Sequence, residues 1–196
     1  MCHYHLKNTP LAGSYDENRY VFVALFYGHA NEKERFLLDF FLGSMVRDHE
    51  AYGCCYSDLT GTTLTIRGKQ HKTRTVEISP RLADAINERR KHSKSEYLFP
   101  NRYGRPDTHL LYKLQSIARR AEAKFHCELH KLRKTGASRR YLAGASLMTL
   151  MQELGHESLK TTQVYLSDVR KEEEIRKAVA DADYVPKPQI VRASNG

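Results

Sequence analysis

Apolar side chains recur with a helical period in the first third of the chain. Residues 20–27 are apolar enough for a helix, and residues 28–31 interrupt it. A second helix is predicted over residues 32–49, because the segment starts with acidic residues and carries an apolar stripe. The stripe consists of Phe36, Leu37, Phe40, Phe41 and Met45. Residues 1–17 are polar and have no clear period, so the ordered part of the chain is expected to begin with this pair of helices.

The period then changes from helical to alternating. Two short segments, residues 62–67 and 73–79, alternate apolar and polar positions as half-buried strands do. The apolar positions are Leu64, Ile66, Val76 and Ile78. Residues 58–61 are predicted as a loop, and residues 68–72 as the turn between the strands. The pattern therefore predicts a small antiparallel hairpin with one buried face.

Helical patterns fill most of the remaining sequence. Pro80 opens a helix that is predicted to run to about residue 91. A loop spans residues 98–106, and further helices are predicted near residues 107–123, 130–143, 147–154, 159–166 and 170–182. The fold class is therefore α+β, mainly α-helical with a small antiparallel β-hairpin or sheet. We expect an irregular N-terminal segment at 1–17, one domain at 18–182 and a loose C-terminal tail at 183–196.

Length and charge narrow the class of partner. A chain of 196 residues suits a single domain, and its formal charge of +9 favours a polyanionic partner such as DNA. The charge is uneven, because acidic residues gather near the C-terminus while basic residues crowd the middle. The basic residues are Lys113, Arg119, Arg120, Lys124, Lys131, Arg133, Lys134, Arg139 and Arg140. A solvated basic face is the simpler explanation of such a cluster, so charge alone does not decide for DNA.

Cysteine usage indicates a reducing compartment, and hydropathy gives no sign of a membrane-spanning segment. Four cysteines, two of them adjacent at Cys54 and Cys55, do not form a disulfide framework. No apolar run reaches membrane-spanning length, so we expect a cytoplasmic protein. The histidines and cysteines at residues 2–5 and 126–130 lack paired C-x-x-C spacing, and no P-loop is present. We therefore expect neither a metal nor a cofactor.

The candidate chemistry lies between His130 and Tyr165. His130 and Arg133 are three residues apart, so on a helix they share one face. A Leu-Gly-His sequence ends at His156, and Tyr165 follows nine residues later. A neutral phenol has a pKa of about 10 and is a poor nucleophile. It needs activation and a dense positive field to attack phosphorus, and this combination of residues suits attack on a phosphodiester.

This spacing resembles the tyrosine recombinase (phage integrase) family, in which H-x-x-R is followed by L-G-H and a nucleophilic tyrosine. The family's first arginine lies in a pattern close to T-G-L-R-x-x-E, matched here by Ser44-Met-Val-Arg47-Asp-His-Glu50. A lysine in a hairpin turn is matched by Lys69. The resemblance covers residues 20–168 and departs at Met45, where the family usually has glycine. It implies the catalytic core of DNA breaking-rejoining enzymes.

The resemblance also implies roles. The catalytic residues would be Arg47, Lys69, His130, Arg133, His156 and Tyr165. Arg47 and Arg133 would clamp the scissile phosphate while Tyr165 attacks it, leaving a 3′-phosphotyrosyl link and a free 5′-hydroxyl. His130 would help take the tyrosine proton, and Lys69 would protonate the departing 5′-oxygen. His156 would add a hydrogen bond to the phosphorane.

Simpler readings stand beside these roles. Lys72 rivals Lys69 at the same turn, and His156 could only cap the helix that ends at Gly155. Glu50 and Asp58 look structural, since each can orient an arginine or cap a turn.

Three functions are open from the sequence: a site-specific recombinase or integrase, a type IB topoisomerase-like nicking and resealing enzyme, and a non-catalytic DNA-binding remnant of an integrase. The first is favoured because the H-x-x-R and L-G-H-to-tyrosine spacing follows the recombinase form. Such enzymes bind double-stranded DNA and assemble on it as tetramers, so self-association and a place on the nucleoid are expected. Recombinases usually carry an additional N-terminal helical domain, so the chain would be an excised domain, a truncated product or a minimal enzyme.

Overall fold

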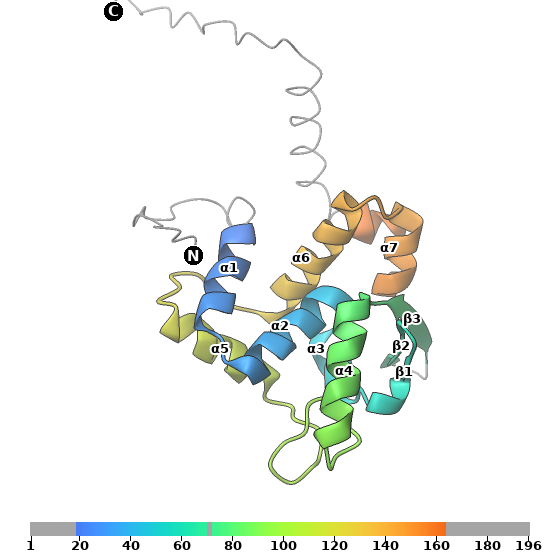
Figure 1. Ribbon diagram of the computed structural model, residues 1–196. Coiled ribbons are helices and arrows are strands. Elements are labelled where there is room, and N and C mark those ends of the chain that lie inside the picture. Colours follow the sequence, from blue (N-terminus) through green and yellow to red (C-terminus); the bar gives the residue numbers. More distant parts are fainter. Residues whose placement is uncertain (1–18, 70–71, 164–196) are drawn as a thin grey trace, which may run out of the picture.

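Helices pack beside one small sheet in the computed structural model, which describes residues 19–69 and 72–163 (Figure 1). The helices are α1 (Arg19–His29), α2 (Glu32–Ser44), α3 (Asp48–Tyr52), α4 (Pro80–His92), α5 (Leu110–Arg120), α6 (Leu129–Leu142) and α7 (Leu147–Leu154). The strands are β1 (Leu59–Thr60), β2 (Thr63–Arg67) and β3 (Thr73–Glu77), preceded by the 3₁₀ turn η1 (Tyr56–Asp58). The mainly helical class with a small antiparallel sheet is confirmed.

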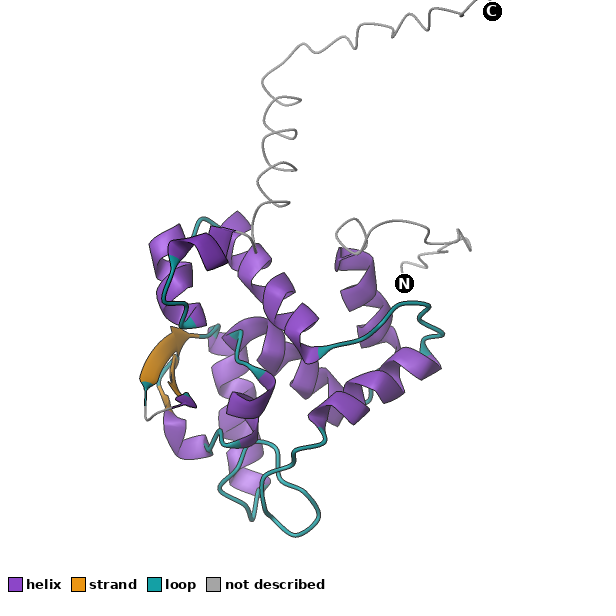
Figure 2. Ribbon diagram, turned by 180° about the vertical axis from the view of Figure 1, so that it is seen from behind, coloured by secondary structure: helices purple, strands orange, loops and turns teal. Residues whose placement is uncertain are grey.

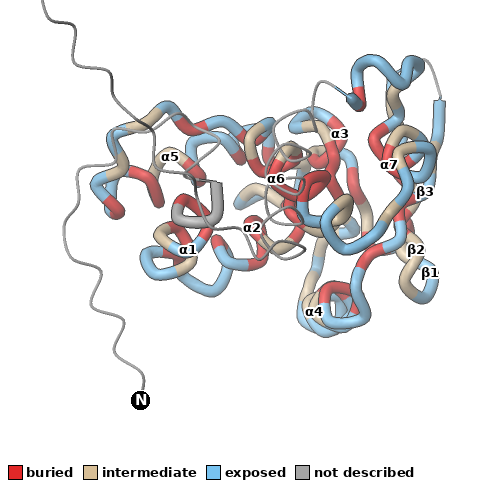
Figure 3. Tube along the Cα trace, turned by 90° about the horizontal axis from the view of Figure 1, so that it is seen from above, coloured by how far each residue is buried: buried red, intermediate tan, exposed pale blue. Residues whose placement is uncertain are grey.

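The core forms where α2 packs against α6. In Figure 3 the buried segments concentrate along these two helices, with α1 and α5 on one side and the sheet and α7 on the other. Helix α2 supplies aromatic side chains, among them Phe40 and Phe41, which are fully buried. Its start is fixed by Asn31, whose side chain accepts from the Glu34 N–H at 3.0 Å while the Glu34 carboxylate accepts from the Asn31 N–H at 2.8 Å.

Helix α2 ends earlier than its apolar stripe predicts. The prediction of one helix over residues 32–49 is wrong, because Met45 adopts a left-handed conformation with φ 52° and ψ 32°. That conformation costs a non-glycine residue about 1–2 kcal/mol, and the fully buried methionine side chain offsets it by filling the core. Left-handed backbone also favours glycine, the residue usual at this place in the family that the sequence resembles. The break turns the chain so that α3 starts in a new direction right after Arg47.

The sheet lies at one side of the helices, as Figure 2 shows. The predicted hairpin is confirmed as β2 and β3, with Leu64 opposite Val76 and Ile66 opposite Arg74. A third strand, β1, pairs with β2 where a loop was predicted, giving the antiparallel order β1-β2-β3. Leu64, Ile66 and Val76 are fully buried, so the face that the alternation predicted is the one that packs on the helices.

One arginine connects α6 to three other elements of the fold. Arg140 of α6 donates to the Glu153 carboxylate of α7 and to the main-chain oxygens of Glu77 and Gly43, the latter at 3.0 Å. The Glu77 oxygen lies at the end of β3, and the Gly43 oxygen lies in the last turn of α2. A single guanidinium therefore ties α2, β3 and α7 to α6.

The remaining helices agree with the sequence pattern within a few residues. Ser79 caps α4 by accepting from the Leu82 N–H at 3.3 Å, and Pro80 occupies the first turn as predicted. Backbone at 159–163 is helical up to the end of the described residues. The predicted helix at 170–182, the segment 1–17 and the tail at 183–196 lie outside the described residues. Within the described ranges, none of the helices is long and apolar enough to cross a membrane.

Gly136 allows α6 to approach α2. A Cβ at this position would lie 2.3 Å from the Leu42 carbonyl oxygen and 3.0 Å from Met45 Cγ, so the helices would have to separate. We expect Gly136→Ala to lower the free energy of unfolding by about 1–3 kcal/mol, as overpacking does. Urea denaturation followed by far-UV circular dichroism measures this loss.

Gly28→Ala is the matched control, because a Cβ there meets nothing within 4 Å. It should be neutral or stabilise the protein by up to about 1 kcal/mol through helix propensity. A Gly136→Ala variant as stable as Gly28→Ala would show that the α2–α6 contact does not require glycine.

Candidate active site

Three arginines converge on the C-terminal end of α7. The main-chain oxygens of residues 153, 154 and 155 each accept a hydrogen bond from a different guanidinium. The bonds run from Arg74 Nε to the Glu153 oxygen at 2.7 Å, from Arg133 Nη2 to the Leu154 oxygen at 2.5 Å, and from Arg47 Nη2 to the Gly155 oxygen at 3.1 Å. Helix ends leave their last carbonyls without intrahelical partners, and cations are favoured there. The end of α7 is therefore the place where three distant parts of the chain meet.

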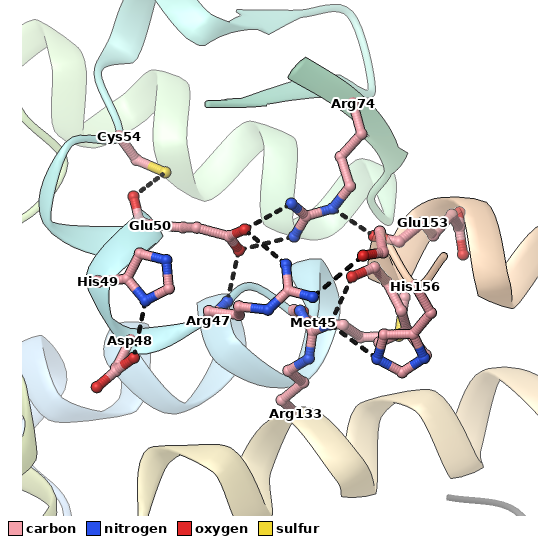
Figure 4. Close-up of polar contacts among 12 residues, drawn as sticks. Met45, Arg47, Asp48, His49, Glu50, Cys54, Arg74, Arg133, Glu153 and His156 are labelled. Atoms are coloured by element: carbon pink, nitrogen blue, oxygen red, sulfur yellow. Dashed lines mark hydrogen bonds and ion pairs between the residues drawn. The ribbon is translucent and has the colours of Figure 1, made fainter. Parts of the chain in front are cut away.

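Arg133 is the most deeply placed of the three. Arg133 is only 1% exposed, and it lies in the second turn of α6. Besides the Leu154 oxygen, its guanidinium donates to the main-chain oxygen of Met45, and Nη2 lies 3.4 Å from His156 Nε2. Burial of a charged guanidinium is costly unless hydrogen bonds hold it. Figure 4 shows Arg133 rising from α6 between Met45 and His156, so the left-handed turn at Met45 helps build the site.

Glu50 links the other two arginines. Its carboxylate accepts from Arg47 Nη1 at 3.0 Å and from both terminal nitrogens of Arg74 at 2.7 Å each (Figure 4). It also accepts from the Arg47 main-chain N–H at 2.7 Å, which caps α3. Burial by itself would raise the pKa of Glu50, but the bonds from Arg74 and Arg47 outweigh it and lower the pKa to about 2. The structural role predicted for Glu50 is confirmed.

His156 follows the glycine that ends α7. Gly155 has φ 62°, so it is the left-handed C-cap that the sequence suggested, and the chain then turns back over the site. Burial, followed by the charges of Arg133 and Arg47, lowers the pKa of His156 to about 4. The imidazole is therefore neutral at physiological pH. His156 does more than cap the helix, because its ring faces Arg133.

His130 lies in the first turn of α6, one turn before Arg133. Partial burial and the charge of Arg133 lower the pKa of His130 below its usual value. A neutral imidazole at this position can accept a proton. The spacing of His130 and Arg133 on α6 thus brings the imidazole within the electrostatic influence of the guanidinium, and the role of His130 stays a prediction.

The hairpin turn carries both candidate lysines. Lys69 is exposed, and its main-chain oxygen accepts from the Lys72 N–H at 3.2 Å. Lys72 Nζ pairs at 2.8 Å with Oε1 of Glu157, the residue after His156 in the sequence. Both side chains of this pair are exposed. Residues 70 and 71 between the lysines lie outside the described residues, so the choice between them stays a prediction.

Two further predictions concern residues at the margin of the site. Asp58 caps η1 through the Cys55 N–H at 2.8 Å and pairs with Arg67 at 2.5 Å, so its structural role is confirmed. Tyr165, the predicted nucleophile, lies outside the described residues.

Within 19–69 and 72–163, no group of three or more His, Cys, Asp and Glu residues is placed to hold a metal ion.

Two residues of the site, Arg74 and Thr162, were not predicted from the sequence. Arg74 shares the parity of Val76 in β3, so alternation directs it inward, and a charge at an inward position requires a partner. Thr162 is fully buried, and its Oγ1 lies 3.0 Å from His156 Nδ1. No pattern in a short polar segment distinguishes such a threonine from a surface one.

The Glu50 contacts generate a test of stability. The folded-state pKa of about 2 lies below the ordinary 4.5, so Glu50 stabilises the fold above pH 4.5, and this contribution is lost as pH falls toward 2. At 1.36 kcal/mol per pKa unit, it amounts to roughly 3 kcal/mol. We expect Glu50→Gln to lower the free energy of unfolding at pH 7 and to lose this part of the pH dependence, as measured by urea denaturation from pH 7 to pH 2.

Glu88→Gln serves as the control, because Glu88 pairs with Lys91 on the surface. It should leave the free energy of unfolding close to the parental value, because water and salt screen an exposed ion pair. Equal effects of the two substitutions would contradict the central role of Glu50.

Curated relatives match this chain over about two thirds of its length. The tyrosine recombinase XerC of Listeria welshimeri is 33% identical over 146 residues, which is 68% of this chain and 49% of that protein. The XerC protein of Lacticaseibacillus casei is 29% identical over 149 residues, covering 69% of this chain and 50% of the relative. The chain thus spans about half the length of these relatives.

Solved structures share the fold. The XerH recombinase bound to palindromic difH substrate superposes with a TM-score of 0.66 at 21% identity, covering 85% of this chain and 52% of that one. The catalytic domain of bacteriophage HP1 integrase gives a TM-score of 0.59 at 24% identity, covering 79% and 86%. The family model described as phage integrase matches residues 22–172, most of the sequence. With the expected arginines and histidine gathered at the end of α7, this chain belongs to the phage integrase family.

Proposed function

We propose that this chain is the catalytic part of a site-specific DNA recombinase or integrase, which cuts and rejoins DNA through a 3′-phosphotyrosyl intermediate. The observation that carries the proposal is the convergence of Arg47 and Arg133 on the last carbonyls of α7, with the His156 ring beside Arg133. The relatives support it, because those named are tyrosine recombinases and the XerH structure is a complex with its substrate. The Tn1549 transposon integrase is likewise described in complex with circular intermediate DNA.

The two arginines would hold the scissile phosphate. A guanidinium presents parallel N–H donors that match two phosphate oxygens, so Arg47 and Arg133 together neutralise the charge that develops on the phosphorane. The guanidinium of Arg133 is already aimed by main-chain oxygens, and Arg47 is held by Glu50 and the Gly155 oxygen. Such fixed geometry lowers the cost of reorganisation when the transition state forms.

The remaining residues would move protons and complete the attack. Tyr165 attacks phosphorus, forming the phosphotyrosyl bond and breaking the bond to the 5′-oxygen. His130, whose lowered pKa leaves it neutral near pH 7, helps take the tyrosine proton. Lys69 protonates the departing 5′-oxygen, and His156 adds a hydrogen bond to the phosphorane. The covalent link conserves the energy of the phosphodiester, so rejoining needs no ATP.

Double-stranded DNA would be the partner, and a tetramer on two duplexes the working assembly. The formal charge of +9 supports binding to a polyanion. We place the protein on the nucleoid for the same reason. Relaxation of supercoiled DNA by the monomer, without exchange between duplexes, would instead favour a topoisomerase-like enzyme.

The nucleophile is tested by covalent trapping on a nicked suicide duplex. The parental chain should form a protein–DNA adduct that survives denaturation, and Tyr165→Phe should abolish it because only a hydroxyl is lost. DNA binding, measured by a gel shift, should stay within about threefold, since a single substitution that removes no phosphate contact changes affinity little.

Tyr141→Phe is the control, because Tyr141 of α6 is the nearest other candidate and is half-buried. An adduct that persists in Tyr165→Phe and disappears in Tyr141→Phe would move the nucleophile. Binding without any adduct by the parental chain would favour the non-catalytic remnant.

A substrate with sulfur at the 5′-bridging position distinguishes the two lysines. Sulfur leaves without protonation, so loss of the general acid matters only for normal DNA. We expect Lys69→Ala to cleave the sulfur substrate at close to the parental rate and normal DNA far more slowly. Lys72→Ala, which removes only an exposed ion pair, should affect both substrates equally. Selective rescue of Lys72→Ala would give the acid role to that residue.

A further inference from the structure

The two nitrogens of the His156 ring have different partners. Nε2 lies 3.4 Å from Arg133 Nη2, and Nδ1 lies 3.0 Å from the hydroxyl oxygen of Thr162. Thr162 belongs to the helical backbone at 159–163, and the residue is fully buried. A buried hydroxyl needs a hydrogen-bond partner within the protein, and the imidazole nitrogen supplies one here.

Arg133 and Thr162 together set which ring nitrogen carries the proton. A guanidinium nitrogen is only a donor, so Nε2 can meet it only as an acceptor. A neutral imidazole has one N–H, and the proton must then be on Nδ1. Nδ1–H donates to the Thr162 hydroxyl, which can accept it. Burial beside Arg133 and Arg47 keeps the ring neutral near pH 7, since it lowers the pKa of His156 to about 4.

We propose that Thr162 is a positioning residue of the active site, which holds His156 as the Nδ1–H tautomer with Nε2 directed at Arg133. The ring then steadies the buried guanidinium before a phosphate arrives. This inference rests on the proposed function for its catalytic consequence, but the tautomer itself does not depend on any activity.

The same contact serves both charge states of the imidazole. Nδ1 carries a proton in the neutral Nδ1–H tautomer and in the imidazolium, so Thr162 can accept from it in either state. Only Nε2 changes: it is an acceptor facing Arg133 in the neutral ring, and it becomes a donor for a phosphoryl oxygen once the ring takes up a proton beside the anionic phosphate. Thr162 therefore lets His156 exchange partners at Nε2 while the ring keeps its orientation.

Nuclear magnetic resonance of isotope-labelled histidine side chains tests the tautomer directly on the full chain. The chain has ten histidines, so the His156 signals are identified by their loss in His156→Asn. At pH 7 the free protein should show the proton on Nδ1. Thr162→Val, which keeps the shape and removes the hydroxyl, should shift the signals toward a mixture of tautomers, whereas Thr161→Val at the exposed neighbouring position should not.

Single-turnover cleavage of the suicide duplex tests the consequence. Thr162→Val should cleave about tenfold more slowly, because a buried N–H loses its acceptor. Thr162→Ser restores the hydroxyl and should recover the parental rate to within about twofold. Thr161→Val should cleave at the parental rate.

The outcomes separate this proposal from the function proposed above. Nε2–H as the parental tautomer, or an unchanged tautomer and rate in Thr162→Val, would overturn the role of Thr162. Absence of adduct from the parental chain would count against the recombinase function. The nuclear magnetic resonance experiment would still decide the tautomer. If Thr162→Val does not fold, the parental tautomer and the Thr162→Ser rate decide: Nδ1–H with near-parental cleavage supports the role, and any other result contradicts it.

Discussion

Three consecutive carbonyl groups at the end of α7 hold the arginines of the site together. Guanidinium groups repel one another, and burying one without hydrogen bonds is costly. The main-chain oxygens of residues 153–155 supply a directed partner for each, and the negative end of the helix dipole adds a favourable field. The cluster therefore exists before any phosphate is present, which is the condition for electrostatic catalysis without reorganisation.

The rest of the fold places these arginines at that helix end. Arg133 is carried there by α6, whose close approach to α2 requires Gly136. Arg47 is brought in by the left-handed turn at Met45, and Arg74 by the inward face of β3. Arg140 fixes α7 itself through its bonds to Glu153, Gly43 and Glu77. Several contacts that pack the core thus also fix the geometry of the site.

Much of this was predictable from sequence, and the failures have physical causes. Periodicity predicted the helices, the hairpin and its buried face, because those patterns come from burial. It continued α2 past Ser44 because Met45 fits the apolar stripe, whereas left-handed backbone leaves no mark on hydropathy. Motif spacing singled out Arg47, Arg133 and His156, which the structure brings together at the end of α7. It missed Arg74 and Thr162, since their roles depend on contacts between residues far apart in sequence or on a single hydroxyl.

Helix α3 has only five residues and could not persist alone in water. Its first turn is secured by the Glu50 carboxylate, which caps the chain at Arg47 and is itself fastened by Arg74. The segment that orients Arg47 is therefore among the parts of the fold least able to stand without their neighbours. We expect local opening of α3 to cost less than global unfolding and to disrupt the site first. Competence for chemistry and stability of the fold can thus be lost separately in this protein.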